Sequence, residues 1–130
     1  MIYITGDTHR KFERVQTFCK KYVTNKEDTL IILGDAGINY FGGQKDRELK
    51  TMLNKLPITM LCIHGNHEMR PDSIVTYKET EWRSGVVYVE PEFPNLFFAK
   101  DGEIYEFAGN RCVVIGGAYS VDKPVRLANN

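Results

Sequence analysis

The chain has 130 residues, a length that fits one domain with a hydrophobic core of its own. Lysine plus arginine and aspartate plus glutamate number 17 each, so net charge indicates neither a nucleic-acid partner nor an anionic membrane surface. No apolar stretch approaches the length of a membrane span, and no signal peptide is visible, so we expect no membrane partner. The three cysteines are far apart and form no CxxC pair, which disfavours a disulfide framework or a thiolate zinc site and favours a reducing cytoplasm.

The first half of the chain alternates short apolar runs with helical periodicity. Apolar runs at 1–5, 30–33 and 58–63 predict three strands. Over 12–22 and 45–56, apolar residues recur every three or four positions, which predicts two helices. This alternation, with short connections, predicts right-handed crossovers and a largely parallel sheet, so the fold class is α/β.

The second half has a different pattern. Residues 71–85 are polar and predict no particular element. Beyond them, short β-like runs predict four more strands, at 86–89, 96–99, 104–107 and 112–115. The Asp101-Gly102 pair between two of these runs favours a hairpin turn. We expect these strands to be antiparallel and to form a second sheet packed beside the first.

Three polar clusters follow the three predicted strands of the first half. They are Asp7-Thr8-His9, Gly34-Asp35 and Gly65-Asn66-His67-Glu68. If the three strands end at one edge of the sheet, two carboxylates, an amide and two imidazoles converge there. Asp7 and His9 are two positions apart in an extended segment, so their side chains point the same way. Such nitrogen and oxygen ligands suit one or two divalent transition metals and metal-assisted phosphoryl chemistry.

Each cluster alone also has an ordinary explanation. Asp7 and His9 fit a turn aspartate and a surface histidine, and Asp35 fits an Asx turn or a helix N-cap. Asn66 and His67 fit a solvent-facing loop. All three clusters in this order, each at a strand end, favour the functional interpretation. A nucleotide-binding βαβ module is disfavoured, because neither GxGxxG nor GxxxxGK[ST] occurs.

The three clusters resemble the first three motifs of the calcineurin-like metallophosphoesterases, in particular the small bacterial and phage-type members. Residues 116–120, Gly-Gly-Ala-Tyr-Ser, are similar to the segment that follows a central strand in these proteins. The resemblance implies a β-sandwich flanked by helices, in four αββα layers, with the site at the strand ends.

The resemblance also implies an activity and a role for each residue. It implies hydrolysis of a phosphate ester by metal-bound hydroxide at a site with two divalent transition metals, manganese first, with iron, zinc or nickel as alternatives. Asp7 and His9 are implied to bind the first metal, Asp35 to bridge both, and Asn66 to bind the second. His67 is implied to lie near the leaving-group oxygen, so that Asp35, Asn66 and His67 form the catalytic set.

Two arginines are candidates for binding the phosphate of the substrate. Arg10 stands where family members usually have glycine after Asp-x-His, and it either clamps a phosphate or is a solvated residue at a helix start. Arg70 follows the third cluster, and a surface ion pair is its alternative use.

The family pattern requires further histidines downstream, whereas this chain has only His9, His64 and His67. We expect His64 to be a buried, hydrogen-bonded side chain rather than a ligand. We therefore expect residues 1–130 to be the N-terminal portion of a single metallophosphoesterase domain, C-terminally incomplete and truncated before its last metal ligands. Metal occupancy and activity are then reduced, and exposed strand edges favour a homodimer. The alternative function is a catalytically weak module that binds metal or self-associates.

Overall fold

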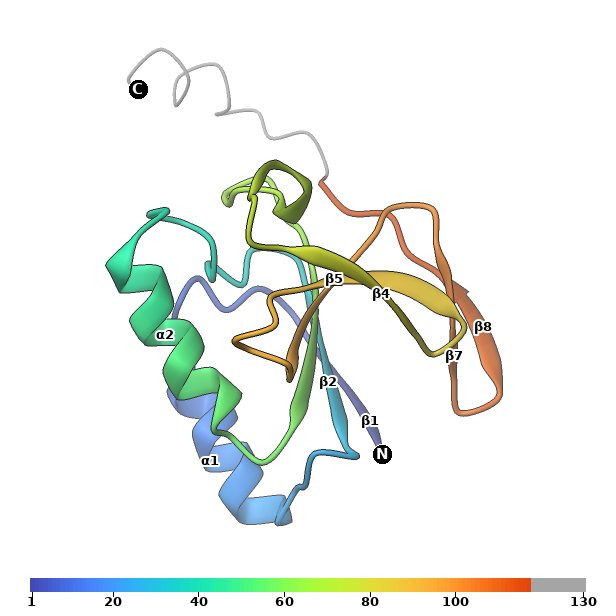
Figure 1. Ribbon diagram of the computed structural model, residues 1–130. Helices are drawn as coiled ribbons and strands as arrows, with labels where there is room; N and C mark the ends of the chain where they lie inside the picture. The colour runs from blue at the N-terminus through green and yellow to red at the C-terminus, as the bar shows by residue number, and fades with distance from the viewer. Residues whose placement is uncertain (118–130) are drawn as a thin grey trace.

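The computed structural model describes residues 1–117 (Figure 1). The first half contains β1 (Ile2–Thr5), α1 (Glu13–Tyr22), β2 (Thr29–Leu33), α2 (Gln44–Asn54) and β3 (Thr59–Ile63). The second half contains the 3-10 helix η1 (Pro71–Ser73) and the strands β4 (Lys78–Trp82), β5 (Gly85–Val89), β6 (Leu96–Ala99), β7 (Ile104–Phe107) and β8 (Asn110–Val113). Each element predicted for the first half is present, with ends shifted by at most two residues.

A six-stranded sheet is the centre of the molecule, in the order β1-β2-β3-β6-β5-β4. Strands β1, β2, β3 and β6 are parallel, whereas β5 and β4 continue the sheet in antiparallel fashion. Both helices cover the same face of this sheet (Figure 1). As predicted, the carboxyl ends of β1, β2 and β3 therefore lie together at one edge.

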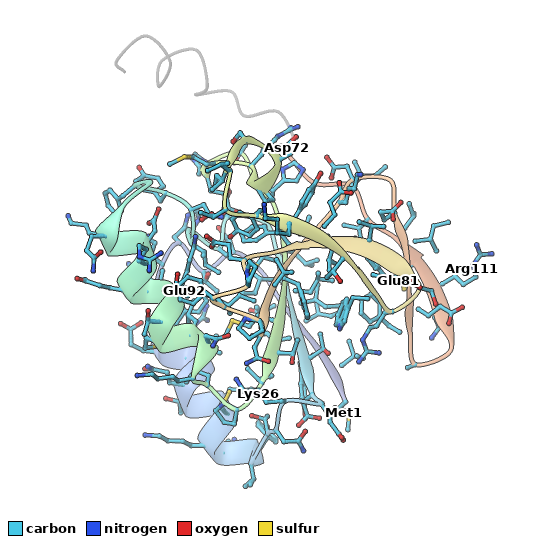
Figure 2. The ribbon with its side chains drawn as sticks, viewed as in Figure 1. Met1, Lys26, Asp72, Glu81, Glu92 and Arg111 are labelled. Atoms are coloured by element: carbon cyan, nitrogen blue, oxygen red, sulfur yellow. The ribbon has the colours of Figure 1, made fainter. Side chains whose placement is uncertain are left out.

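Alternating residues of the central strands divide the core in two. Leu30, Ile32 and Met60 belong to a cluster on the helix side, together with Phe12 of the α1 entry. On the opposite face, the β7–β8 hairpin buries a second cluster, made of Ile31, Leu61, Val87, Ala99, Tyr105, Phe107 and Val114. Figure 2 shows side chains filling the space on both faces of the sheet. Residues 1–117 thus form a layer of helices and two layers of sheet, which are three of the four expected layers.

Strands β5 and β6 correct the prediction for the second half. Both lie in the first sheet, β6 parallel to β3 and β5 antiparallel to β6, rather than in a second sheet with β7. Leu96 and Phe98 are buried on one face and Phe97 packs on the other, and a strand covered on both faces belongs inside a sheet. The predicted Asp101-Gly102 hairpin turn is wrong for the same reason, because this segment crosses from one sheet to the other.

Strand β4 was not predicted at all. Its sequence, Lys78-Glu-Thr-Glu-Trp82, is exposed except at the half-buried tryptophan, so it has no apolar alternation to identify it. It forms by pairing with β5 at the edge of the sheet, where Glu81 projects outward (Figure 2). A charged edge strand of this kind resists pairing with another chain.

None of the helices in residues 1–117 has the length and apolarity needed to cross a membrane. All three cysteines are free: Cys19 and Cys62 are buried and Cys112 is half-buried.

Candidate metal centre

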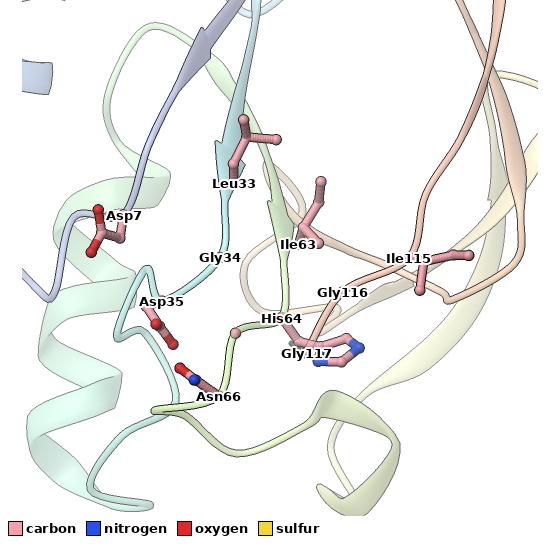
Figure 3. Close-up of a pocket in the computed structure, with 11 residues that line it drawn as sticks. Asp7, Leu33, Gly34, Asp35, Ile63, His64, Asn66, Ile115, Gly116 and Gly117 are labelled. Atoms are coloured by element: carbon pink, nitrogen blue, oxygen red, sulfur yellow. The ribbon is translucent and has the colours of Figure 1, made fainter. Parts of the chain in front are cut away.

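The loops that leave β1, β2 and β3 meet at the carboxyl edge of the sheet and border a pocket of about 690 Å³. Asp7, Asp35 and Asn66 line this pocket, one from each loop (Figure 3). Gly116 and Gly117 form another wall, so the segment after the last strand reaches the same edge, as predicted. The rest of that predicted segment, residues 118–120, lies outside the described part of the chain.

Asp7 and His9 form the first pair of candidate ligands. The Asp7 carboxylate contacts Nε2 of the His9 imidazole, so the two side chains meet. They do so across a turn, with His9 at φ of +47°, and not along the extended backbone that the spacing argument assumed. Their side chains are 57% and 52% exposed, respectively, so both remain accessible to an ion from solvent.

Asp35 connects the three loops. Its backbone has φ of +46°, directly after Gly34 at +84°, so the chain turns sharply as it leaves β2. The Asp35 carbonyl accepts a hydrogen bond from the backbone N–H of His9 at 2.9 Å. Its Oδ1 accepts another from the N–H of His67 at 2.8 Å. The carboxylate predicted to bridge two metals is therefore fixed between the other two motifs.

Gly65 allows the third loop to approach Asp35 closely. A Cβ at this position would lie 2.0 Å from Asp35 Oδ1 and 2.3 Å from its backbone nitrogen, which no side chain can satisfy. The next residue, Asn66, presents its amide toward the Asp35 carboxylate across the pocket (Figure 3). The glycine of the motif is thus required by the distance between the two candidate ligands.

Glu68 links the second and third loops from behind. One of its carboxylate oxygens accepts a hydrogen bond from Gly65 N–H at 3.1 Å and the other from Gly37 N–H at 3.0 Å. Burial raises the pKa of Glu68, and these two N–H groups oppose the rise because they stabilise the ionised form. The carboxylate acts as a clamp rather than as a group open to the pocket.

The Arg10 guanidinium is engaged within the protein. It donates to Asp46 Oδ1 at 2.6 Å and to the Gly37 carbonyl at 2.7 Å, and it lies over the Phe41 ring. Arg10 has φ of +69°, a backbone conformation that glycine adopts without strain. The glycine that usually follows Asp-x-His in the family would suit this conformation. Its role in substrate binding stays a prediction.

His67 and Arg70 lie on opposite sides of the third loop. His67 lines a second pocket, of about 310 Å³, with His9 and Asp35, and its ring centroid lies 6.0 Å from that of His9. Arg70 is exposed and borders a separate pocket with His64 and Asp101. Their roles as proton donor and phosphate ligand also stay predictions.

The chemistry of the donor set fits a divalent transition metal. Asp7, His9, Asp35 and Asn66 offer two carboxylates, an imidazole and an amide oxygen. Within residues 1–117, however, no three histidine, cysteine, aspartate or glutamate side chains lie close enough together to hold an ion by themselves. The residues thus fit a metal site, and its binuclear form stays a prediction.

One polar pair at this edge escaped the sequence analysis. Asp101 contacts the His64 imidazole, 37 positions away, although its local sequence was interpreted as a hairpin turn. His64 itself is buried and hydrogen-bonded, as predicted.

Comparison with known proteins agrees with the motifs. A family model described as calcineurin-like phosphoesterase matches residues 1–128, which include all the residues discussed above. Searches of curated proteins and of solved structures gave no significant match. Since the family model covers nearly the whole chain, this protein belongs to the calcineurin-like phosphoesterase family.

Proposed function

We propose that this chain hydrolyses phosphate esters with two divalent transition-metal ions, Mn²⁺ in first place and iron, zinc or nickel as alternatives. Asp7 and His9 hold the first ion, Asp35 is shared, and Asn66 binds the second. The observation that carries the proposal is the position of Asp35, which is hydrogen-bonded to the loops of both other motifs. Membership of the family supports a metal-dependent phosphoesterase in general.

When bound, the ions supply Lewis-acid charge for the phosphate oxygens and make an attacking water more acidic. The protein's own residues do the rest. The hydrogen bond from His67 N–H to Asp35 keeps the His67 loop in a fixed relation to the bridging carboxylate. From there the His67 imidazole gives a proton to the leaving alkoxide oxygen. Arg10 lines the pocket of His67, and Arg70 reaches Gly117 at the wall of the larger pocket. Both add positive charge, which favours a phosphate dianion.

The test is hydrolysis of p-nitrophenyl phosphate with Mn²⁺ by the wild type and by Asp35→Asn. We expect the substitution to abolish turnover and to weaken Mn²⁺ binding in calorimetry, because one shared oxygen donor is lost. The matched control is Asp28→Asn: Asp28 precedes the opposite end of β2, where it pairs with the Met1 ammonium group. Turnover that is equal in the wild type and Asp35→Asn would overturn the proposal.

A second candidate, a catalytically weak module that binds metal or self-associates, has its own support. Ile4, Leu33, Val113 and Ile115 are 64%, 53%, 63% and 76% exposed, and β1 is an edge strand without the charges of β4. Such an edge favours pairing with a second copy. Light scattering tests this candidate, since a monodisperse monomer at high concentration contradicts it. In either case the three free cysteines favour a reducing cytoplasm.

A further inference from the structure

The buried His64 and the partly exposed Asp101 form a hydrogen-bonded pair behind the third motif. His64 follows β3 directly and is 4% exposed, and its Nε2 lies 2.7 Å from Asp101 Oδ2. Burial works to raise the pKa of Asp101, but hydrogen bonds and the charge of Arg70 outweigh it, so the pKa is lowered and the group is a carboxylate. A carboxylate only accepts hydrogen bonds, so the Nε2 of His64 that faces it carries a proton. The other ring nitrogen, Nδ1, is buried and has no hydrogen-bond partner among residues 1–117.

The same pair binds the segment that follows β8. Gly116 N–H donates to Asp101 Oδ1 at 2.8 Å, and Gly117 N–H donates to the His64 carbonyl at 3.0 Å. Asp101 therefore uses one oxygen for the imidazole and the other for this segment. Three stretches far apart in sequence, after β3, after β6 and after β8, are joined at this point.

The two glycines fit against His64 so closely that no side chain has room. A Cβ at Gly116 would lie 2.5 Å from the His64 carbonyl oxygen. A Cβ at Gly117 would lie 2.7 Å from His64 Cε1 and 3.0 Å from Arg70 Nη2. Figure 3 shows the His64 ring beside Gly117 in the lining of the pocket. The guanidinium of Arg70 reaches the same place.

We propose that His64 and Asp101 are positioning residues that latch the Gly116–Gly117 segment onto the end of β3, as a wall of the pocket that holds Asp35 and Asn66. This inference rests on the proposed phosphoesterase function. The wall lies beside the candidate ligands but supplies none of them. Loss of the latch therefore weakens binding of the phosphate ester, whereas metal affinity and the chemical step are retained.

The first test is Asp101→Asn in the full chain, followed by NMR of the histidine ring nitrogens. In the wild type we expect the proton of His64 on Nε2, and only three histidines need to be resolved. The asparagine oxygen can still accept from Gly116, but its amide then faces Nε2, so the proton of His64 moves to Nδ1. Exchange of the Gly117 amide hydrogen should accelerate roughly tenfold. A wild-type proton on Nδ1, or unchanged exchange, overturns the latch.

The control for this variant is Asp72→Asn, because Asp72 borders the same pocket as Asp101 and is exposed. It should leave the His64 proton and the Gly117 exchange rate as they are in the wild type. Kinetics with p-nitrophenyl phosphate then separate binding from chemistry. Asp101→Asn should raise KM roughly tenfold and change kcat less than about twofold. An equal loss in kcat, or weakened Mn²⁺ binding, contradicts positioning of the wall.

A second variant tests the latch without changing either member of the pair. Gly117→Ala and Gly109→Ala both place alanine at a positive φ, +77° and +81°, but only the first meets a neighbour, because nothing lies within 4 Å of a Cβ at Gly109. Gly117→Ala should reproduce the increase in KM, and Gly109→Ala should not. Equal effects of the two variants overturn the proposal.

These readouts also separate the latch from the proposed function. If the wild type shows no turnover with Mn²⁺, the proposed function fails. The position of the His64 proton and the exchange of the Gly117 amide still decide for or against the latch.

Discussion

The region formed by β1, β2 and β3 and the region formed by β4 to β8 use their residues differently. In the first, every strand is followed by a loop that carries candidate ligands, and Asp7 and His9 are more than half exposed. In the second, the side chains mainly fill a core, with Tyr105 fully buried and no predicted ligand present. In the proposed function the first region carries the chemistry and the second supports it, and the His64–Asp101 pair joins them.

This difference predicts separate consequences for mutation. Substitutions in the second region should change the free energy of unfolding, because they remove buried contacts. Substitutions at the strand ends of the first should change metal binding and turnover, because exposed polar groups add little to stability. A substitution that breaks this division shows where the two regions depend on each other.

The largest effect is expected at Tyr105, the centre of the hairpin-side core. Tyr105→Ala should lower the free energy of unfolding by about 3–5 kcal/mol, the usual cost of truncating a buried aromatic side chain. The hydroxyl also donates to the Val86 carbonyl at 2.5 Å and accepts from Lys100 N–H at 3.0 Å. Chemical denaturation measures the change.

Tyr105→Phe is the matched variant, since it removes only the hydroxyl. It should cost about 1–3 kcal/mol, because two backbone groups are left unpaired. In both variants, the Mn²⁺ affinity of the folded fraction should equal that of the wild type. A selective loss of metal binding in Tyr105→Phe would show that the two regions are not separate.

The next effect is expected at Gly65, in the region of strand ends. Gly65→Ala places a Cβ 2.0 Å from Asp35 Oδ1, so the carboxylate and Asn66 must move apart. A displacement of about 1 Å at a reacting site costs roughly a hundredfold in rate, and overpacking costs about 1–3 kcal/mol of stability. Turnover of p-nitrophenyl phosphate and thermal unfolding together measure these two effects.

Gly6→Ala is the control, because Gly6 adjoins Asp7 and a Cβ there meets nothing within 4 Å. It should leave both measurements close to the wild type. If Gly65→Ala instead lowers stability with unchanged turnover, Gly65 serves packing and not the separation of the ligands.

The sequence predicts the first region well because its information is local. The run Leu30–Leu33 is apolar and is followed at once by Gly34-Asp35, so the strand and the candidate ligand are visible in one short window. The same holds for β3 and Asn66. Local patterns do not reveal the backbone conformation of Arg10. Its positive φ accompanies hydrogen bonds to residues near position 36, which are far away in the sequence.

The second region depends on contacts between distant residues, which no window of sequence contains. Strand β4 has no apolar pattern and exists because β5 lies beside it. Asp101 looked like a turn residue, and only the crossover between the sheets brings it to His64. The order of strands had to be known before either residue could be interpreted.

Arg10 tests whether a residue of the first region can act mainly through stability. Arg10→Ala should lower the free energy of unfolding by about 1–3 kcal/mol, because Asp46 is buried and loses its cationic partner. The loss stays below that of a fully buried pair, since Asp46 also accepts from the backbone N–H groups of Phe41 and Gly42. Thermal unfolding measures this loss of stability. The control is Arg14→Ala, because Arg14 is an exposed arginine of α1.

The same variant decides how Arg10 serves the substrate. A guanidinium held by Asp46 contributes mainly long-range charge, so KM should rise only about twofold to threefold. An increase in KM far beyond that, with stability unchanged, would mean that Arg10 leaves Asp46 to bind the phosphate directly.

The smallest effect is the pH dependence of the contact between the two regions. The pKa of Asp101 is lowered in the folded protein: its hydrogen bonds from Gly116 and His64 and the charge of Arg70 outweigh the opposing effect of burial. As pH falls, the unfolded chain therefore takes up the proton first. The stabilisation is present above the ordinary pKa of aspartate and is lost as pH falls through the lowered value.

Because the Asp101 side chain is 39% exposed, solvent screening limits this stabilisation to less than about 1 kcal/mol. The difference in melting temperature between wild type and Asp101→Asn should stay constant from about pH 6 to about pH 5 and shrink from there to about pH 3, the acid range of carboxylates. A difference that is constant over that range would mean that the Asp101 charge does not hold the two regions together.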